Sequence, residues 1–247
     1  MPESYVTYGR VFTPWDSVVS RRKGYSNTLP ILHEHKAYDE QAAQRIFQNV
    51  LTKYSQPIQQ QFLASIASLQ GLVSLDALAQ ALASGSLDTI LQVIPWDQLG
   101  SASAQVISTL DTIFAESAQA AAATIVEAVE VGFAFDVEHP QAIAAAQTNA
   151  AQYVTNITTA SRNGIRQAIV RTLEQGTPTQ EVIEEIQKNI GLTARQESAV
   201  DAFAKKLAQE GVAPQQAAAR VQRYREAQLE YRAEVIARTE ILQASNS

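Results

Sequence analysis

Turn-forming residues are scarce in this chain, which has ten glycines and eight prolines among its 247 residues. A fold of many short strands needs a turn signal about every ten residues, so this supply is too small for one. Aromatic residues make up only 7 % of the chain, and alanine supplies much of its apolar content. Small side chains bury little area each, which favours long, closely packed helices. The sequence therefore predicts an all-α, elongated, multi-helix protein.

Apolar residues recur at helical spacing from about residue 39 onward. Pro57 suits the first turn of a helix, so we expect a new helix to open there. Residues 193–196 have the form of a capping box, which predicts another helix start. The expected helices cover 39–54, a segment from Pro57 to about 70, 75–82, 87–94, 103–131, 141–175, 178–190, 194–210 and the stretch from Pro214 onward.

The last expected helix carries a charge on its apolar side. The spacing assigns to this side Val221, Tyr224, Ala227, Tyr231, Val235, Arg238 and Leu242. Arg238 needs a partner there, and Glu234, four residues before it, has the favourable orientation. We expect a partly buried ionic network around them that includes Arg232, Thr239 and Glu240. It would be either a subunit contact or an internal salt bridge.

The first 37 residues show no helical period, and proline and glycine interrupt their aromatic residues. Tyrosine, tryptophan and arginine are enriched where proteins bind one another. We therefore expect an extended, irregular N-terminal arm over 1–37 that docks on another protein. The docking residues would be Tyr5, Tyr8, Phe12, Trp15, Arg21, Arg22 and Tyr25. An arm that wraps over its own domain would explain the same pattern.

Lysine and arginine are absent between Lys53 and Arg162, an interval that holds nine acidic residues. Such a surface repels phosphate groups, so contact with packaged DNA would have to come from the arm or from the C-terminal helices. The alanine-rich helical region at 38–132 is weakly charged and poorly solvated. We expect neighbouring subunits or a partner to cover it. The alternative is that these helices simply pack on each other.

Recognisable catalytic motifs are missing from the sequence. There is no cysteine, which excludes disulfides, thiolate metal sites and cysteine nucleophiles. No phosphate-binding GxxxxGK[ST] loop, GxGxxG fingerprint or GxSxG elbow occurs. His33 and His35 lack further ligands nearby, and Glu184 and Glu185 have the spacing of a solvated helix face. We therefore expect no catalytic residue, no metal site, no cofactor and no enzymatic activity.

Two segments of the C-terminal third carry a resemblance to a known family. Residues 231–240 read Tyr-Arg-Ala-Glu-Val-Ile-Ala-Arg-Thr-Glu, followed by Ala244 and Asn246, and residues 190–196 read Ile-Gly-Leu-Thr-Ala-Arg-Gln. Together with Gly176-Thr177-Pro178 they resemble the phage minor head proteins, the Mu F-like head morphogenesis family. We expect a helical head-morphogenesis domain of this kind over 133–247. The family pattern continues with a glycine and a further stretch, so this domain would be trimmed or completed by another segment.

The resemblance implies a structural protein of the tailed-phage head, close to the portal vertex and made in the cytoplasm of the host bacterium. Its partners would be the portal protein, the major capsid protein or both, with several copies in the virion and no membrane span. It would support head assembly, DNA packaging or ejection. The signature positions, carried over with a structural role, are Gly191, Leu192, Thr193, Arg232, Glu234, Arg238, Thr239, Glu240 and Asn246. The alternative is an internal virion protein that is ejected and contacts DNA or the host membrane.

Overall fold

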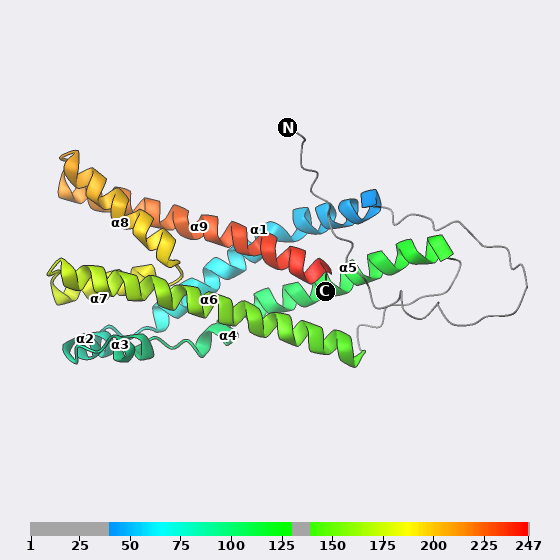
Figure 1. Ribbon diagram of the computed structural model, residues 1–247, viewed down its shortest axis with the longest axis horizontal. Coiled ribbons are helices and arrows are strands. Elements are labelled where there is room, and N and C mark those ends of the chain that lie inside the picture. Colours follow the sequence, from blue (N-terminus) through cyan, green and yellow to red (C-terminus); the bar gives the residue numbers. More distant parts are fainter. Residues whose placement is uncertain (1–39, 130–138, 247) are drawn as a thin grey trace, which may run out of the picture. The chain divides into compact units, whose positions relative to one another are not determined.

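A computed structural model describes residues 40–129 and 139–246, which form helices joined by short turns (Figure 1). The described helices are α1 (Glu40–Leu72), α2 (Leu75–Ala83), α3 (Leu87–Val93), α4 (Gln98–Ala102), α5 (Ala104–Val129), α6 (Pro140–Glu174), α7 (Thr179–Asn189), α8 (Ala194–Gln209) and α9 (Pro214–Asn246). No strand occurs in these two ranges, and the predicted all-α class is confirmed. The expected arm at 1–37 lies outside the described residues.

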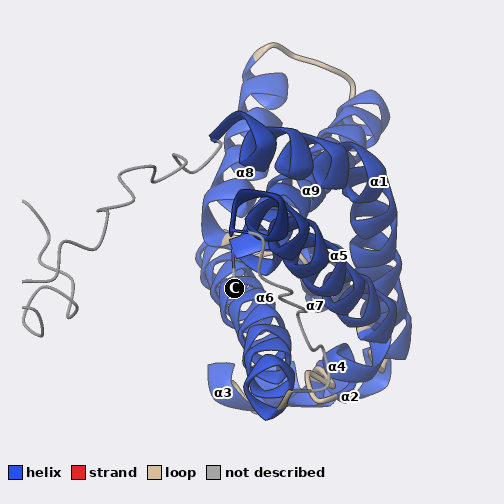
Figure 2. Ribbon diagram, turned by 90° about the vertical axis from the view of Figure 1, so that its right-hand side faces the viewer, coloured by secondary structure: helices blue, strands red, loops and turns tan. Residues whose placement is uncertain are grey.

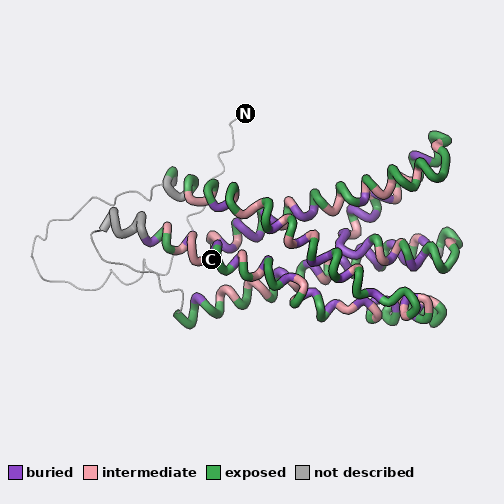
Figure 3. Tube along the Cα trace, turned by 180° about the vertical axis from the view of Figure 1, so that it is seen from behind, coloured by how far each residue is buried: buried purple, intermediate pink, exposed green. Residues whose placement is uncertain are grey.

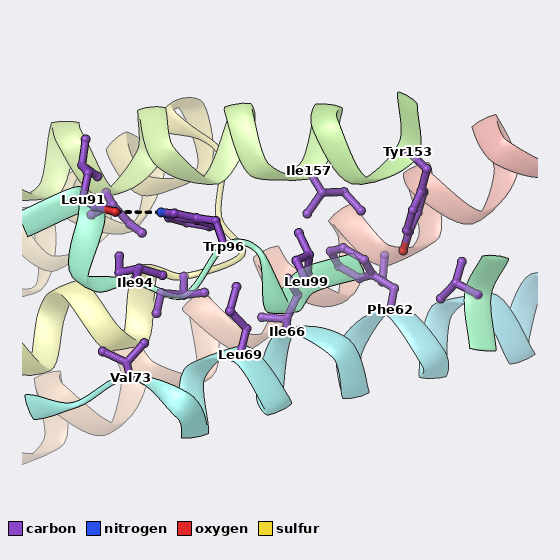
Figure 4. Packing of buried hydrophobic residues seen from close by; sticks show 14 of the residues in the cluster. Phe62, Ile66, Leu69, Val73, Leu91, Ile94, Trp96, Leu99, Tyr153 and Ile157 are labelled. Carbon is purple, nitrogen blue, oxygen red and sulfur yellow. Dashed lines mark hydrogen bonds between the residues drawn. The ribbon is translucent and has the colours of Figure 1, made fainter. Parts of the chain in front are cut away.

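The described helices other than α8 contribute buried residues to one hydrophobic core. Four long helices, α1, α5, α6 and α9, lie side by side in the end-on view of Figure 2 and pack on one another. The core continues through Trp96, whose indole Nε1 donates a hydrogen bond of 2.8 Å to the carbonyl of Leu91 (Figure 4). Residues of this core come from both 40–129 and 139–246. The core therefore joins the two regions that were expected at 38–132 and 133–247.

α1 continues through Pro57, where a second helix start was predicted. A proline inside a helix removes one backbone hydrogen bond and costs about 3 kcal/mol. Buried side chains at four-residue spacing continue across it, with Val50 before the proline and Ile58 and Phe62 after it. Because burial on both sides outweighs the lost hydrogen bond, the helix is not interrupted, and the expected break is wrong.

The buried side of α9 is the opposite of the expected one. Tyr231, Val235 and Leu242 are 61, 44 and 48 % exposed, and the Arg238 side chain is 65 % exposed. The side that faces the core carries Ala233, Ala237, Ile241 and Ala244. The three alanines among them let α9 lie against α1 and α5. Figure 3 shows how buried and exposed positions alternate along the described helices. The prediction failed because it followed the large apolar residues, whereas alanines form most of the packing surface.

Candidate functional site

The turn that joins α7 to α8 is built from residues 190–193 and is enclosed by other helices. Gly191 has a φ of 97°, a left-handed conformation that strongly favours glycine. A Cβ atom at this position would lie 2.6 Å from the Ile66 side chain of α1 and 3.1 Å from the Leu229 side chain of α9. Thr193 then starts α8 with the predicted capping box, in which its hydroxyl and the Gln196 side chain bind each other's backbone N–H groups. The turn therefore requires both its glycine and its threonine.

α6 and α1 hold the same turn from two further sides. Gly164 of α6 lies so close to it that a Cβ atom there would overlap the carbonyl oxygen of Leu192. Gln70 of α1 donates a hydrogen bond of 3.1 Å to the carbonyl of Ile190. Gln187 of α7 in turn donates one of 3.0 Å to the carbonyl of Gln70. Backbone groups of the turn are thus paired with side chains from distant parts of the chain.

Arg232 of α9 completes this arrangement from inside the protein. It is 7 % exposed, and one amino group of its guanidinium donates to the carbonyl of Gly191 and, at 3.2 Å, to the hydroxyl of Ser161. The guanidinium carbon lies 5.8 Å from the centre of the Phe62 ring. Burial lowers the pKa of Arg232 to about 10, so the side chain stays charged at neutral pH. Among the described residues no carboxylate forms an ion pair with it, so its charge serves to hold a backbone carbonyl.

Four of the predicted signature residues therefore meet at one place. We call this place the signature junction, and it consists of Gly191, Leu192, Thr193 and Arg232 with the groups that hold them. Gln196 adds a hydrogen bond of 2.5 Å to the backbone carbonyl of Gln228 in α9. The polar groups of the junction hold backbone atoms, so it positions α6, α7, α8 and α9, and Thr193, Gln196 and Arg232 also line the groove between α8 and α9.

The other signature residues lie elsewhere, and the expected ionic network does not form. Glu234 and Arg238 make an exposed ion pair of 2.9 Å on the outer side of α9. Thr239 is exposed, and its hydroxyl donates to the carbonyl of Val235. Arg232 and Glu240 are buried and are not linked to that pair. Asn246 ends α9, and its side chain lies outside the described part.

Glu240 is buried against α5 and α6. It is 9 % exposed and has no hydrogen bond or ion pair within the described residues. With Asp111 it lines a small cavity of about 10 Å³, room for one water molecule. Burial raises the pKa of Glu240 to about 6 and also raises the pKa of Asp111. A carboxylate in this position destabilises the fold when it is ionised.

Replacing Glu240 by glutamine should stabilise the protein by up to about 2 kcal/mol at pH 7.5. The pKa of about 6 lies above the value of 4.5 expected for an unfolded chain, so the folded state prefers the protonated group. The stabilisation that protonated Glu240 gives the folded state is fully present below pH 4.5 and is lost as the pH rises through 6. Urea unfolding of both proteins at pH 4.5 and 7.5 checks this, with exposed Glu230→Gln as the control. An equal difference between the two proteins at both pH values would contradict it.

An ionic cluster that the sequence reading missed joins α6, α7, α8 and α9. Arg171 contacts Glu197 at 2.5 Å and both Glu185 and Asp201 at 3.5 Å, and Arg225 contacts Glu185 at 2.7 Å. Glu197 is 1 % exposed, and burial raises its pKa in spite of the neighbouring Arg171. The expectation that Glu185 lies on a solvated face is wrong. Its partners come from α6 and α9, which no local spacing indicates.

Two grooves on the described surface lie between neighbouring helices. A groove of about 560 Å³ runs between α8 and α9, and Arg195, Tyr231 and Val235 are among the residues that line it. A second groove, of about 370 Å³, runs between α5 and α6. Across 40–129 and 139–246, no group of three or more His, Cys, Asp or Glu residues is placed to hold a metal ion. The docking residues expected in the arm, with His33 and His35, lie outside the described residues.

In the described part of the chain, no single helix combines the length and the apolar character that crossing a membrane requires. Only the pair 44–72 and 75–83, bent by 65° where the two helices meet, passes the same test when taken together.

Comparison with known proteins found no family model, no curated protein and no solved structure that matches this chain.

Proposed function

We propose that this chain is a structural minor head protein of a tailed phage. It binds the portal protein, the major capsid protein or both, near the portal vertex, and it supports head assembly, DNA packaging or ejection. In this role it carries out no catalytic step and needs no cofactor. It acts through contacts between its surface and these partners, and the arm at 1–37 anchors it to them.

The signature junction is the observation that carries this proposal. The two motif strings that resemble the phage family are separated in sequence, yet Arg232 of one holds the carbonyl of Gly191 of the other, 41 residues away. Gly191, Thr193 and Arg232 each have a geometric reason for their identity. A chance likeness of two short strings gives no reason for them to form one packed unit. The junction therefore supports reading them as one family signature with a structural role.

The surface supports an assembly role as well. Residues 139–161 carry no Asp, Glu, Lys or Arg, and many of them are exposed on α6. Tyr231, Val235 and Leu242 expose large apolar groups on α9. Exposed apolar side chains of this size are found where proteins bind other proteins.

Purified heads of a phage that encodes this sequence provide the test. We expect mass spectrometry to find the chain in the heads and cross-linking to place it beside the portal or capsid protein. Changing Tyr5, Tyr8, Phe12 and Trp15 to alanine should lower its copy number on the order of tenfold, because aromatic anchors dominate protein interfaces. The matched control is the pair His33→Ala and His35→Ala in the same arm, which should leave incorporation unchanged.

Absence of the chain from purified heads would overturn the proposal. If the chain is present and also floats with lipid vesicles or leaves the head with the DNA, the alternative of an ejected internal protein is favoured. Normal incorporation of the four-alanine variant would refute the anchor role of the arm while leaving a head protein in place.

A further inference from the structure

The outer side of α9 presents an apolar stripe with a cation in it. Tyr231, Val235, Arg238 and Leu242 follow one another at spacings of three and four residues, which places them on one face of the helix. All four are exposed, and Tyr231 and Val235 also form part of the wall of the groove between α8 and α9. Arg238 has a salt bridge to the half-exposed Glu234 beside it. We call these four residues the outer stripe. At 1.5 Å per residue the stripe is about 16 Å long.

The groove between α5 and α6 is largely apolar, with one acidic residue, Asp111, in its lining. Its walls include Ile107 and Phe114 from α5 and Ile143 from α6, which is exposed although its spacing predicted burial. Asp111 stands at its edge, exposed and without an ion pair among the described residues. Asp111 also lines the small cavity beneath, where Glu240 is buried. No lysine or arginine occurs from residue 54 to 161, so neither helix brings a base to this part of the groove.

The stripe and the groove point in different directions from α9. Glu240 and Ala244 lie on the core side of α9 and close the floor beneath the groove. The outer stripe lies half a helical turn away from them, on the opposite side of the same helix. A molecule seated in the groove would therefore leave the outer stripe free for another. Two surfaces that face apart and match each other produce head-to-tail association.

From this complementarity we infer that copies of the chain bind head to tail, with the outer stripe of one copy in the α5–α6 groove of the next and Arg238 paired with Asp111. Tyrosine and arginine are the residues that most often anchor protein interfaces. The groove supplies the matching apolar wall and the opposite charge. The ion pair between Glu234 and Arg238 is exposed, and exposed ion pairs contribute little free energy. Arg238 can therefore exchange Glu234 for Asp111 at little cost. This inference adds a mode of contact to the proposed function, and its test uses the purified chain alone, so its failure would leave the particle experiment open.

Sedimentation of the full chain with exchanged charges tests the pairing. We expect the average mass of the wild-type chain to rise with concentration above the 26.9 kDa of one copy. Arg238→Asp and Asp111→Arg should each weaken association on the order of tenfold or more, and the two changes in one chain should restore it. Arg223→Asp makes the same charge change on α9 outside the stripe and should have no effect. Circular dichroism of each variant confirms that it is folded.

A mixing experiment distinguishes head-to-tail binding from contact between like surfaces. A Val235→Asp copy keeps its groove, and an Ile143→Asp copy keeps its stripe, so neither should associate alone. Their mixture should form one-to-one dimers and nothing larger. Association of the Ile143→Asp copies with one another would show that stripe binds stripe and would overturn the inference. A wild-type chain that stays monomeric at every concentration, or an unrestored charge exchange, would overturn it too.

Discussion

Replacing Arg171 by alanine should lower the free energy of unfolding by about 3–5 kcal/mol, because removing one partner of a buried ion pair leaves the other uncompensated. Arg171 is the cation shared by Glu185, Glu197 and Asp201. Glu197 is almost fully buried, so water cannot replace the lost guanidinium. Denaturant unfolding followed by circular dichroism measures the change.

The control for Arg171 lies on the same helix. Arg166 is exposed and lies 4.0 Å from the exposed Asp88, so Arg166→Ala should change stability by less than about 1 kcal/mol. The pKa of Glu197 is already raised, and loss of Arg171 would raise it further. When the folded state raises the pKa of a carboxyl, protonation of that carboxyl stabilises the fold. This stabilisation is fully present below the pKa of 4.5 that the group has in the unfolded chain, and it is lost as the pH rises. The deficit of Arg171→Ala should therefore shrink as the pH falls toward 4. Equal effects of the two variants would contradict a buried ionic cluster.

Gly164→Ala should destabilise the protein by about 3 kcal/mol even though alanine is the better helix former. In a free helix the exchange would gain about 1 kcal/mol. Here the new methyl group would overlap the carbonyl oxygen of Leu192 and lie 3.2 Å from its carbonyl carbon. Both atoms belong to the backbone, so α6 must move away from the turn, and overpacking of this kind costs about 1–3 kcal/mol or more. Thermal unfolding gives the measurement.

A second glycine provides the comparison for Gly164. Gly71 also lies in a helix, and a Cβ atom there would meet nothing within 4 Å. Gly71→Ala should therefore be neutral or stabilising. If both variants gain stability, α6 does not lie within contact distance of the turn at Leu192.

Local patterns predicted the parts of the fold that local forces determine. The capping box at Thr193 and the buried side of α7, with Val182, Ile183 and Ile186, are confirmed. A cap is formed by residues three positions apart, and α7 has large side chains on one face only. Its burial could be read from the sequence for that reason.

Tertiary contacts determined the parts that were missed. Pro57 is accommodated because neighbouring helices bury both halves of α1. The inner side of α9 consists largely of alanines, which carry no strong periodic signal beside Tyr231 and Val235. The cluster around Arg171 unites residues from four helices. The resemblance picked out Gly191 and Arg232 as signature residues. The hydrogen bond between them could be found only from the structure.

α1 and α9, the first and last described helices, pack along each other, and Ile66 of α1 faces the turn at Gly191. During synthesis on the ribosome, α1 emerges long before α9. The apolar side of α1 therefore stays partly exposed until α9 has been made. Folding through contacts so distant in sequence is slow and leaves nascent chains open to aggregation. Synthesis of α9, more than formation of α1, is thus the event that allows this part of the core to close.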